Sequence, residues 1–119
     1  LFPARVVQSV ERPRAMLNVT NDGWFGNSTG PRQHFHMSRV RAVEEGLPLV
    51  RAANNGISAV IDMHGKVVAR LDMNVRGTID VLLPTANTKP VYARIGDLAF
   101  ILMAAFLALK FALARKIFA

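Results

Sequence analysis

The chain has 119 residues, which is enough for one domain with a core plus an appendage and too few for two ordinary domains. A hydrophobic fraction of 51% together with a formal net charge of +7 favours contact with a membrane over nucleic acid, because the basic residues are scattered and few aromatic side chains accompany them. The sequence has no cysteine, which excludes disulfides, thiolate metal sites and a cysteine nucleophile within these residues.

The N-terminal segment is predicted to form a short helix, a strand and a loop. The chain starts without Met and without a signal-peptide pattern, so we expect this start to be a cut through a longer protein. Residues 4–12 place three valines on one side of a helix that Pro13 ends. Residues 15–20 are predicted as a buried strand, and residues 21–31, with three glycines, as a loop.

A second helix is predicted over residues 33–45. Its apolar residues recur at helical spacing among basic ones, and Ser28 or Thr29 is placed to cap its start. Gly46 and Pro48 follow and predict its end.

After this helix the apolar period changes from about 3.6 to two, which is typical of strands. Four β-branched runs are predicted to form strands, at residues 49–53, 57–62, 66–71 and 77–83. The turns between them contain Asn-Gly and His-Gly pairs, which tolerate positive φ, so we expect an antiparallel meander.

The C-terminal residues predict a membrane-spanning helix. Residues 98–109 carry no charge, and residues 98–118 reach the roughly 20 residues that a crossing needs if Lys110 extends toward the interface. The alternative is a buried terminal helix of a soluble protein, but a small domain has no core that surrounds a helix apolar on every face. The basic residues at its far end would face the cytoplasm and leave the domain on the other side.

Four short motifs occur in a specific order along the chain. They are Asn21-Asp22-Gly23-Trp24-Phe25-Gly26, Gly30-Pro31-x-Gln33-His34, Arg41-Ala42-x-Glu44-x-Gly46-x-Pro48-Leu49-x-Arg51, and Asn54-Asn55-Gly56. In this order they resemble the C-terminal part of the bacterial apolipoprotein N-acyltransferase family. The resemblance runs from Phe2-Pro3 through residues 90–97 into the last helix and covers essentially the whole chain.

The resemblance implies a fold and a domain organisation. The expected fold is α/β: a partial nitrilase-like α-β-β-α sandwich followed by a C-terminal transmembrane helix. Residues 1–90 would be the C-terminal portion of a nitrilase-like (carbon-nitrogen hydrolase) domain, 91–97 a linker and 98–118 the transmembrane helix. The implied location is the bacterial inner membrane, with the domain facing the periplasm.

The resemblance also implies a reaction. Members of the family take an acyl chain from a phospholipid onto a cysteine as a thioester and pass it to the α-amine of diacylglyceryl-cysteine on an apolipoprotein. The family's Cys, Glu and Lys would all lie upstream of Leu1, so we expect this chain to contain no catalytic residue and to be inactive alone. No cofactor and no metal is expected.

Four residues are the candidate substrate-binding residues: Asn21, Trp24, Phe25 and Glu44. By the resemblance, Trp24 and Phe25 lie at the mouth of the pocket, where they line an acyl-chain path or touch the bilayer; the alternative is that they fill the domain core. Asn21, like its neighbour Asp22, is also suited to holding the loop by hydrogen bonds. Glu44 either orients a catalytic group or forms an ion pair with a nearby Arg, such as Arg41 or Arg51.

Other polar residues suggest no separate chemistry. His34 and His36 point to different faces of the predicted helix, which argues against a metal site. Three arginines in this helix or directly before it either meet lipid head groups or form a solvated face: Arg32, Arg39 and Arg41. Asn54-Asn55-Gly56 is most simply a turn, which the nitrilase-like reading places near the pocket.

Two other functions remain open from the sequence. A soluble nitrilase-type amidohydrolase would use the same half-domain to hydrolyse C–N bonds, although it has no need of the uncharged run at residues 98–109. A non-catalytic, membrane-tethered binding domain is favoured by the missing nucleophile, but it requires an independently folded chain.

Overall fold

The computed structural model describes residues 6–7, 11–86 and 88–117, with side chains described up to residue 114. In chain order the elements are β1 (Met16–Asn21), the 3₁₀ helix η1 (Gly23–Phe25), α1 (Gly30–Glu45), β2 (Leu49–Asn54), β3 (Ser58–Ile61), β4 (Val67–Leu71), α2 (Val91–Ile95) and α3 (Leu98–Ile117). Most of the helix predicted at residues 4–12 lies outside the described residues.

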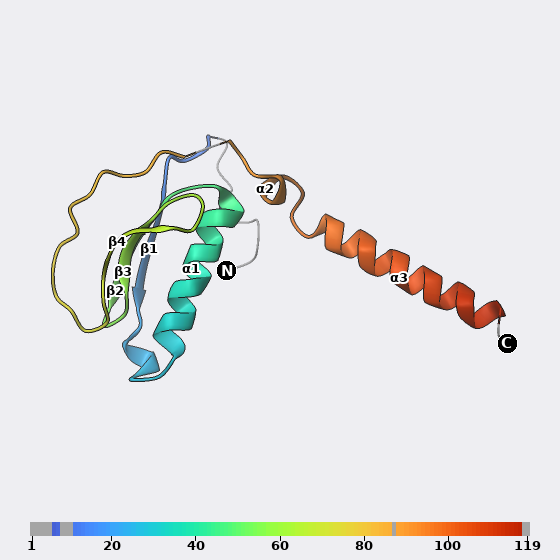
Figure 1. Ribbon diagram of the computed structural model, residues 1–119, viewed down its shortest axis with the longest axis horizontal. Helices are drawn as coiled ribbons and strands as arrows, with labels where there is room; N and C mark the ends of the chain where they lie inside the picture. The colour runs from blue at the N-terminus through green and yellow to red at the C-terminus, as the bar shows by residue number, and fades with distance from the viewer. Residues whose placement is uncertain (1–5, 8–10, 87, 118–119) are drawn as a thin grey trace.

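The strands form one sheet in the order β1-β2-β3-β4 (Figure 1). The predicted antiparallel meander is confirmed for β2, β3 and β4. β1 pairs with β2 in parallel, because α1 carries the chain back to the end of the sheet where β1 began. β1, α1 and β2 are thus a β-α-β unit.

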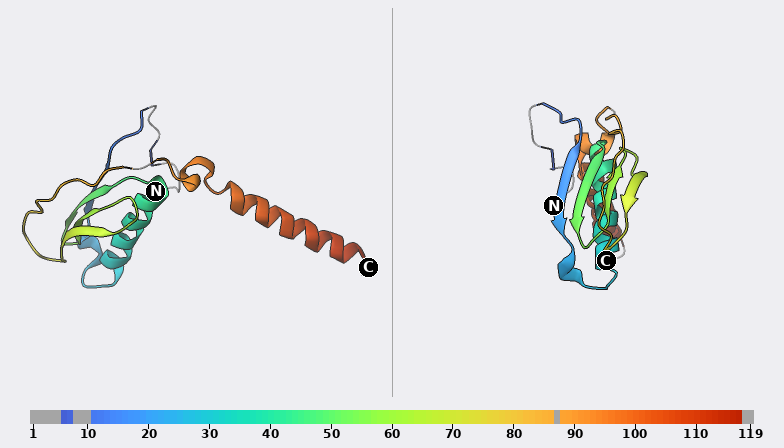
Figure 2. Two further views of the ribbon diagram at one scale, coloured as in Figure 1. Left: turned by 45° about the horizontal axis from the view of Figure 1, so that its top comes forward. Right: turned by 90° about the vertical axis from the view of Figure 1, so that its left-hand side faces the viewer.

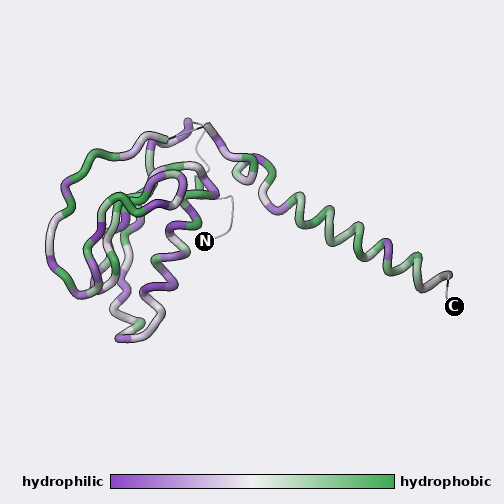
Figure 3. Tube along the Cα trace, viewed as in Figure 1, coloured by the Kyte–Doolittle hydropathy of each residue, from purple (hydrophilic) through white to green (hydrophobic). Residues whose placement is uncertain are grey.

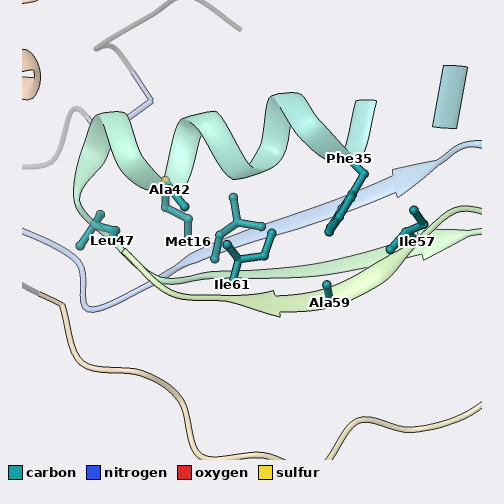
Figure 4. Packing of buried hydrophobic residues seen from close by; sticks show 8 residues of the cluster. Met16, Phe35, Ala42, Leu47, Ile57, Ala59 and Ile61 are labelled. Carbon is teal, nitrogen blue, oxygen red and sulfur yellow. The ribbon is translucent and has the colours of Figure 1, made fainter. Parts of the chain in front are cut away.

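α1 covers one face of the sheet, and the core lies between them (Figure 4). Phe35 and Ala42 are seven residues apart on α1, which is two helical turns, so both face the strands. Side chains alternate along a strand, so Met16 points into the core while Leu17 and Val19 remain exposed on the opposite face. The remaining buried cluster residues are Leu47, Leu49, Ile57, Ala59 and Ile61.

The predicted ends and turns are largely as observed. α1 starts at Gly30, three residues earlier than predicted, because Pro31 is well tolerated in the first turn of a helix. Thr29 is at the N-cap position without a side-chain capping bond, whereas Ser28 Oγ accepts the Gly30 N–H at 3.0 Å. Gly46 ends the helix with φ 62°, as predicted.

The prediction of a strand at residues 77–83 is wrong. This segment runs outside the sheet as irregular chain in both Figure 1 and the left view of Figure 2. It is rich in β-branched residues, but strand propensity acts through packing against a neighbouring strand, and no described strand pairs with it. Leu82 is accordingly exposed.

The C-terminal part extends away from the domain (Figure 1). The short helix α2 lies within the segment predicted as a linker, and there the Tyr92 hydroxyl donates to Asp97 Oδ1 at 2.9 Å, a hydrogen bond that raises the pKa of Tyr92. α3 confirms the predicted helix and is mostly hydrophobic along its length (Figure 3). Its large apolar side chains are exposed up to Leu113.

The transmembrane prediction for residues 98–118 is not supported. Within the residues that the structure describes, no helix combines the length and the apolar character that a membrane crossing requires.

Candidate functional site

The candidate site lies where the parallel strands β1 and β2 end. Parallel strands bring the segments that follow them to the same edge of a sheet, which is where ligands bind in α/β folds. Asn21 and Asn54 are partners in the β1–β2 register, and Asn54 Nδ2 donates to Asn21 Oδ1 at 3.2 Å. The Gly-rich loop after β1 therefore lies beside the Asn54-Asn55-Gly56 turn after β2.

The loop after β1 is held by its own polar residues, as expected for Asn21 and Asp22. The Gly23 N–H donates to Asn21 Oδ1 at 3.0 Å, which turns the chain away from β1. The Asp22 N–H donates to the Asn54 carbonyl at 3.0 Å, and the Asp22 carbonyl accepts the Phe25 N–H, also at 3.0 Å. Both backbone polar groups of Asp22 are therefore used to fix η1.

The two aromatic residues of η1 have different surroundings. Trp24 is 86% exposed, so it is not part of the core that the described residues form. Phe25 is 43% exposed and packs on Gly30 and on the His34 ring, with ring centroids 5.7 Å apart. Phe25 thus attaches the loop to the start of α1, and Trp24 projects from it.

Beneath the loop lies a buried ion pair between Asp22 and Arg51. Arg51 Nη2 donates to Asp22 Oδ2 at 2.7 Å, and neither side chain is exposed to solvent. The other guanidinium donors bind Asn18 Oδ1 (2.7 Å), Ser38 Oγ (2.8 Å) and the Ile57 carbonyl (3.2 Å). A buried guanidinium needs such partners, and here they come from β1, the loop after it, α1 and the segment entering β3.

His34 completes this cluster from α1. Its Nδ1 lies 2.8 Å from Asp22 Oδ1, and because a carboxylate only accepts hydrogen bonds, this contact assigns the proton to Nδ1. Nδ1 is also 3.3 Å from Arg51 Nη2. We call Asp22, His34 and Arg51 the buried ionic network.

Gly56 is required by the close approach of this network. A Cβ at position 56 would lie 2.0 Å from Asp22 Oδ2 and 2.6 Å from Asp22 Cγ. The turn residue with positive φ is Asn55, at 61°, so Gly56 serves to leave room for the carboxylate. A cavity of about 220 Å³ adjoins this point. Its lining residues are Asp22, Gly23, Gly26, Asn27, Asn55, Met73 and Asn74.

The structure does not bring Glu44 to this site. Glu44 lies near the C-terminal end of α1, roughly 20 Å along the helix from Gly30. It forms an ion pair with Arg41, one of the two pairings expected from the sequence; Arg51, the other, pairs with Asp22. Arg39 Nε donates to the Gly65 carbonyl, so this arginine belongs to the packing of α1 rather than to a solvated face.

Replacing Glu44 by Gln is expected to lower the free energy of unfolding by about 1–3 kcal/mol, because the i,i+3 pair with Arg41 is largely shielded from solvent and its loss leaves the Arg41 charge without this partner. Urea unfolding of the wild-type and variant proteins measures the difference. A loss above about 3 kcal/mol would mean that Glu44 holds a structural role beyond its pair with Arg41.

Sequence reasoning missed the buried ionic network. Its members are separated by up to 29 residues, and the charge of Arg51 gives no sign of complete burial. One signal was present: Arg51 lies among apolar residues in a strand whose alternation places it on the core-facing side with Leu49. Among the described residues no cluster of metal-ligating side chains is present.

Comparison with known proteins identifies similar sequences. Residues 2–93 match the family model described as carbon-nitrogen hydrolase. The chain is 50% identical over 117 residues, 98% of its length, to the apolipoprotein N-acyltransferase of Bradyrhizobium diazoefficiens, of which the match covers 22%. It is 60% identical over 84 residues, 71% of its length, to that of Rhizobium meliloti, of which the match covers 16%. The chain therefore spans about a fifth of the length of these curated relatives.

Proposed function

The chain belongs to the carbon-nitrogen hydrolase family, and because its curated relatives are apolipoprotein N-acyltransferases, we propose that it is the C-terminal part of a bacterial enzyme that acylates lipoproteins. Its role is to shape the substrate side of the active site. The nucleophile and its catalytic partners belong to upstream residues of the full-length protein, so the chain alone is inactive.

The proposed reaction has two steps. A cysteine thiolate attacks the ester carbonyl of a phospholipid, which forms a thioester and releases the lysophospholipid as its alcohol after it takes up a proton. The α-amine of diacylglyceryl-cysteine on an apolipoprotein then attacks the thioester carbonyl. An amide forms, the amine loses a proton and the thiolate leaves.

One observation carries this proposal: Trp24 is held almost fully exposed on a tightly fixed loop at the edge where β1 and β2 end. An exposed aromatic side chain on a fixed loop is available to a ligand, a partner or a lipid surface. The position after a parallel strand is the usual place for a binding residue in an α/β fold. We assign to Trp24 and Phe25 the acyl-chain contact, and to Asn21 the support of their loop.

We propose that residues 1–90 form the later half of a nitrilase-like sandwich. α1 covers one face of the sheet, whereas Leu17 and Val19 are exposed on the other, where a second sheet of the full-length protein would pack. Since the donor is a phospholipid and the acceptor a lipoprotein, the full-length enzyme would act at the bacterial inner membrane, with this domain on the periplasmic side.

The reaction class is tested with the purified full-length protein, a phospholipid mixture and a synthetic diacylglyceryl-cysteine peptide. Acylation of the peptide amine, read as a mass gain of one acyl group, is the expected result. Release of ammonia from amide substrates without peptide acylation would instead favour the amidohydrolase alternative. Peptide binding without either reaction would favour the binding-domain alternative.

Replacing Trp24 by Ala in the full-length protein is expected to lower kcat/KM for acyl transfer about tenfold or more and to leave the unfolding midpoint unchanged. The reason is that an 86% exposed side chain contributes little to folding. Initial rates and urea unfolding measure the two effects. Leu82→Ala is the matched control, because Leu82 is a similarly exposed apolar residue away from the site; equal losses in both variants would remove the assignment.

A further inference from the structure

We propose that Arg51 is a positioning residue: through Asp22 it sets the position of the η1 loop, and thereby of Trp24, for acyl transfer. This inference rests on the proposed function for its catalytic consequence. Its structural part, the control of the loop by the buried ionic network, stands on the contacts of the structure alone.

Asp22 is the residue through which the network acts. All four of its polar groups are engaged: the N–H with Asn54, the carbonyl with Phe25, Oδ2 with Arg51 and Oδ1 with His34. Two of these contacts fix the side chain to the domain, and two fix the backbone from which η1 starts. A shift of the Asp22 carboxylate therefore moves the start of the loop.

Arg51 is the residue that fixes the carboxylate. Its planar guanidinium presents donors in a rigid fork, so it binds Asp22, Asn18 and Ser38 at the same time. Asn18 and Ser38 lie on β1 and α1, the two elements that the η1 loop connects, and Asp22 lies in the loop itself. Gly56 lies in close contact with the Asp22 carboxylate, because Asp22 Oδ2 occupies the space that a Cβ at position 56 would fill.

The Arg51→Lys variant distinguishes two roles of Arg51: holding the η1 loop in place and neutralising the charge of Asp22. A Lys ammonium keeps a positive charge next to Asp22, but it is a point charge without the planar fork and cannot hold the same set of partners in one geometry. Arg51→Lys is therefore expected to retain a folded domain with a loosely held loop. Arg70→Lys is the matched control, because Arg70 pairs with Asp72 at the surface, with both side chains more than half exposed.

The first measurement is limited chymotrypsin digestion of the full-length protein, followed by peptide mass mapping. Cleavage after Trp24 and Phe25 reports the η1 loop, and cleavage after Tyr92 on α2 is the internal control. Arg51→Lys is expected to raise the loop cleavage rate about tenfold with the rate at Tyr92 unchanged, and Arg70→Lys to change neither. Unchanged loop cleavage in Arg51→Lys would overturn the inference, whatever the activity.

The second measurement is a double-mutant cycle for acyl transfer with Trp24→Ala, using a phosphatidylethanolamine and phosphatidylglycerol mixture and a diacylglyceryl-cysteine peptide. Arg51→Lys alone is expected to lower kcat/KM 10- to 100-fold, and less than about twofold further when Trp24 is already Ala. If the losses in kcat/KM of the two single variants multiply in the double variant, Arg51 does not act through Trp24 and the inference is overturned. If Arg51→Lys raises the loop cleavage rate but the wild-type protein transfers no acyl group, the control of the loop by Arg51 stands and the proposed function is refuted.

Discussion

Replacing Arg51 by Met is expected to destabilise the domain by about 3–5 kcal/mol, because it leaves the Asp22 carboxylate buried without its cationic partner. It also removes the donors to Asn18, Ser38 and the Ile57 carbonyl, which face the same enclosed space. With a typical domain stability of roughly 5–15 kcal/mol, this loss is sufficient to lower the folded yield visibly.

Pulse proteolysis of the full-length protein in urea measures the effect on the domain. Arg70→Met is the control, since removal of a cation from the exposed Arg70–Asp72 pair costs about 1 kcal/mol or less. Combining Arg51→Met with Asp22→Leu is expected to recover part of the stability, because no charge then remains unpaired between the two positions. If Arg51→Met alone is as stable as Arg70→Met, Asp22 is not held as a buried ion.

Replacing Gly56 by Ala is expected to have the second largest effect. The new Cβ would overlap Asp22 Oδ2, Cγ and Cβ, at 2.0, 2.6 and 2.8 Å. Asp22 cannot swing away without breaking its bonds to Arg51 and His34, so the strain is not relieved by a flexible side chain. We expect a loss of about 1–3 kcal/mol in stability and, because the start of η1 is displaced, a loss of acyl transfer of about 100-fold.

Gly77→Ala is the matched control for this variant. A Cβ at position 77 would first meet a Leu71 methyl group at 3.3 Å, a contact that a small side-chain shift relieves. Urea unfolding and initial rates are measured for both variants. If Gly56→Ala keeps wild-type acyl transfer, the position of Asp22 does not govern the loop.

The secondary structure of the sheet region was predictable from local signals, but burial was not. Leu17 and Val19 are exposed on the strand that was predicted as buried, and three apolar residues of α1 are exposed as well: Met37, Val40 and Val43. The β1 run, the helical period of α1 and the Asn55 and Gly65 turns each match their observed element. The segment at residues 77–83 has the same β-branched character as β4 but forms no strand in the structure. A strand forms only where a neighbouring strand pairs with it, and the sequence of the segment does not show whether such a neighbour is present.

The candidate site was predictable in part for a similar reason. Trp24, Phe25 and Asn21 are adjacent in sequence, so a single loop prediction brought them together. The ion pair joins Asp22, which follows β1, to Arg51 on β2, and it is set by the parallel register in which Asn18 lies opposite Arg51. The sequence predicted the strands but not that pairing, and it therefore assigned Arg51 to Glu44 as a possible partner.

The central claim is that the full-length protein carries an acyl group on a cysteine and transfers it. The most direct measurement is the intact mass of the purified full-length protein after incubation with phospholipid alone and then with a diacylglyceryl-cysteine peptide. We predict a mass gain of one acyl group that hydroxylamine removes and that the peptide accepts on its α-amine. A protein whose mass stays unchanged with phospholipid, while the peptide also remains unmodified, would contradict the assignment as an apolipoprotein N-acyltransferase.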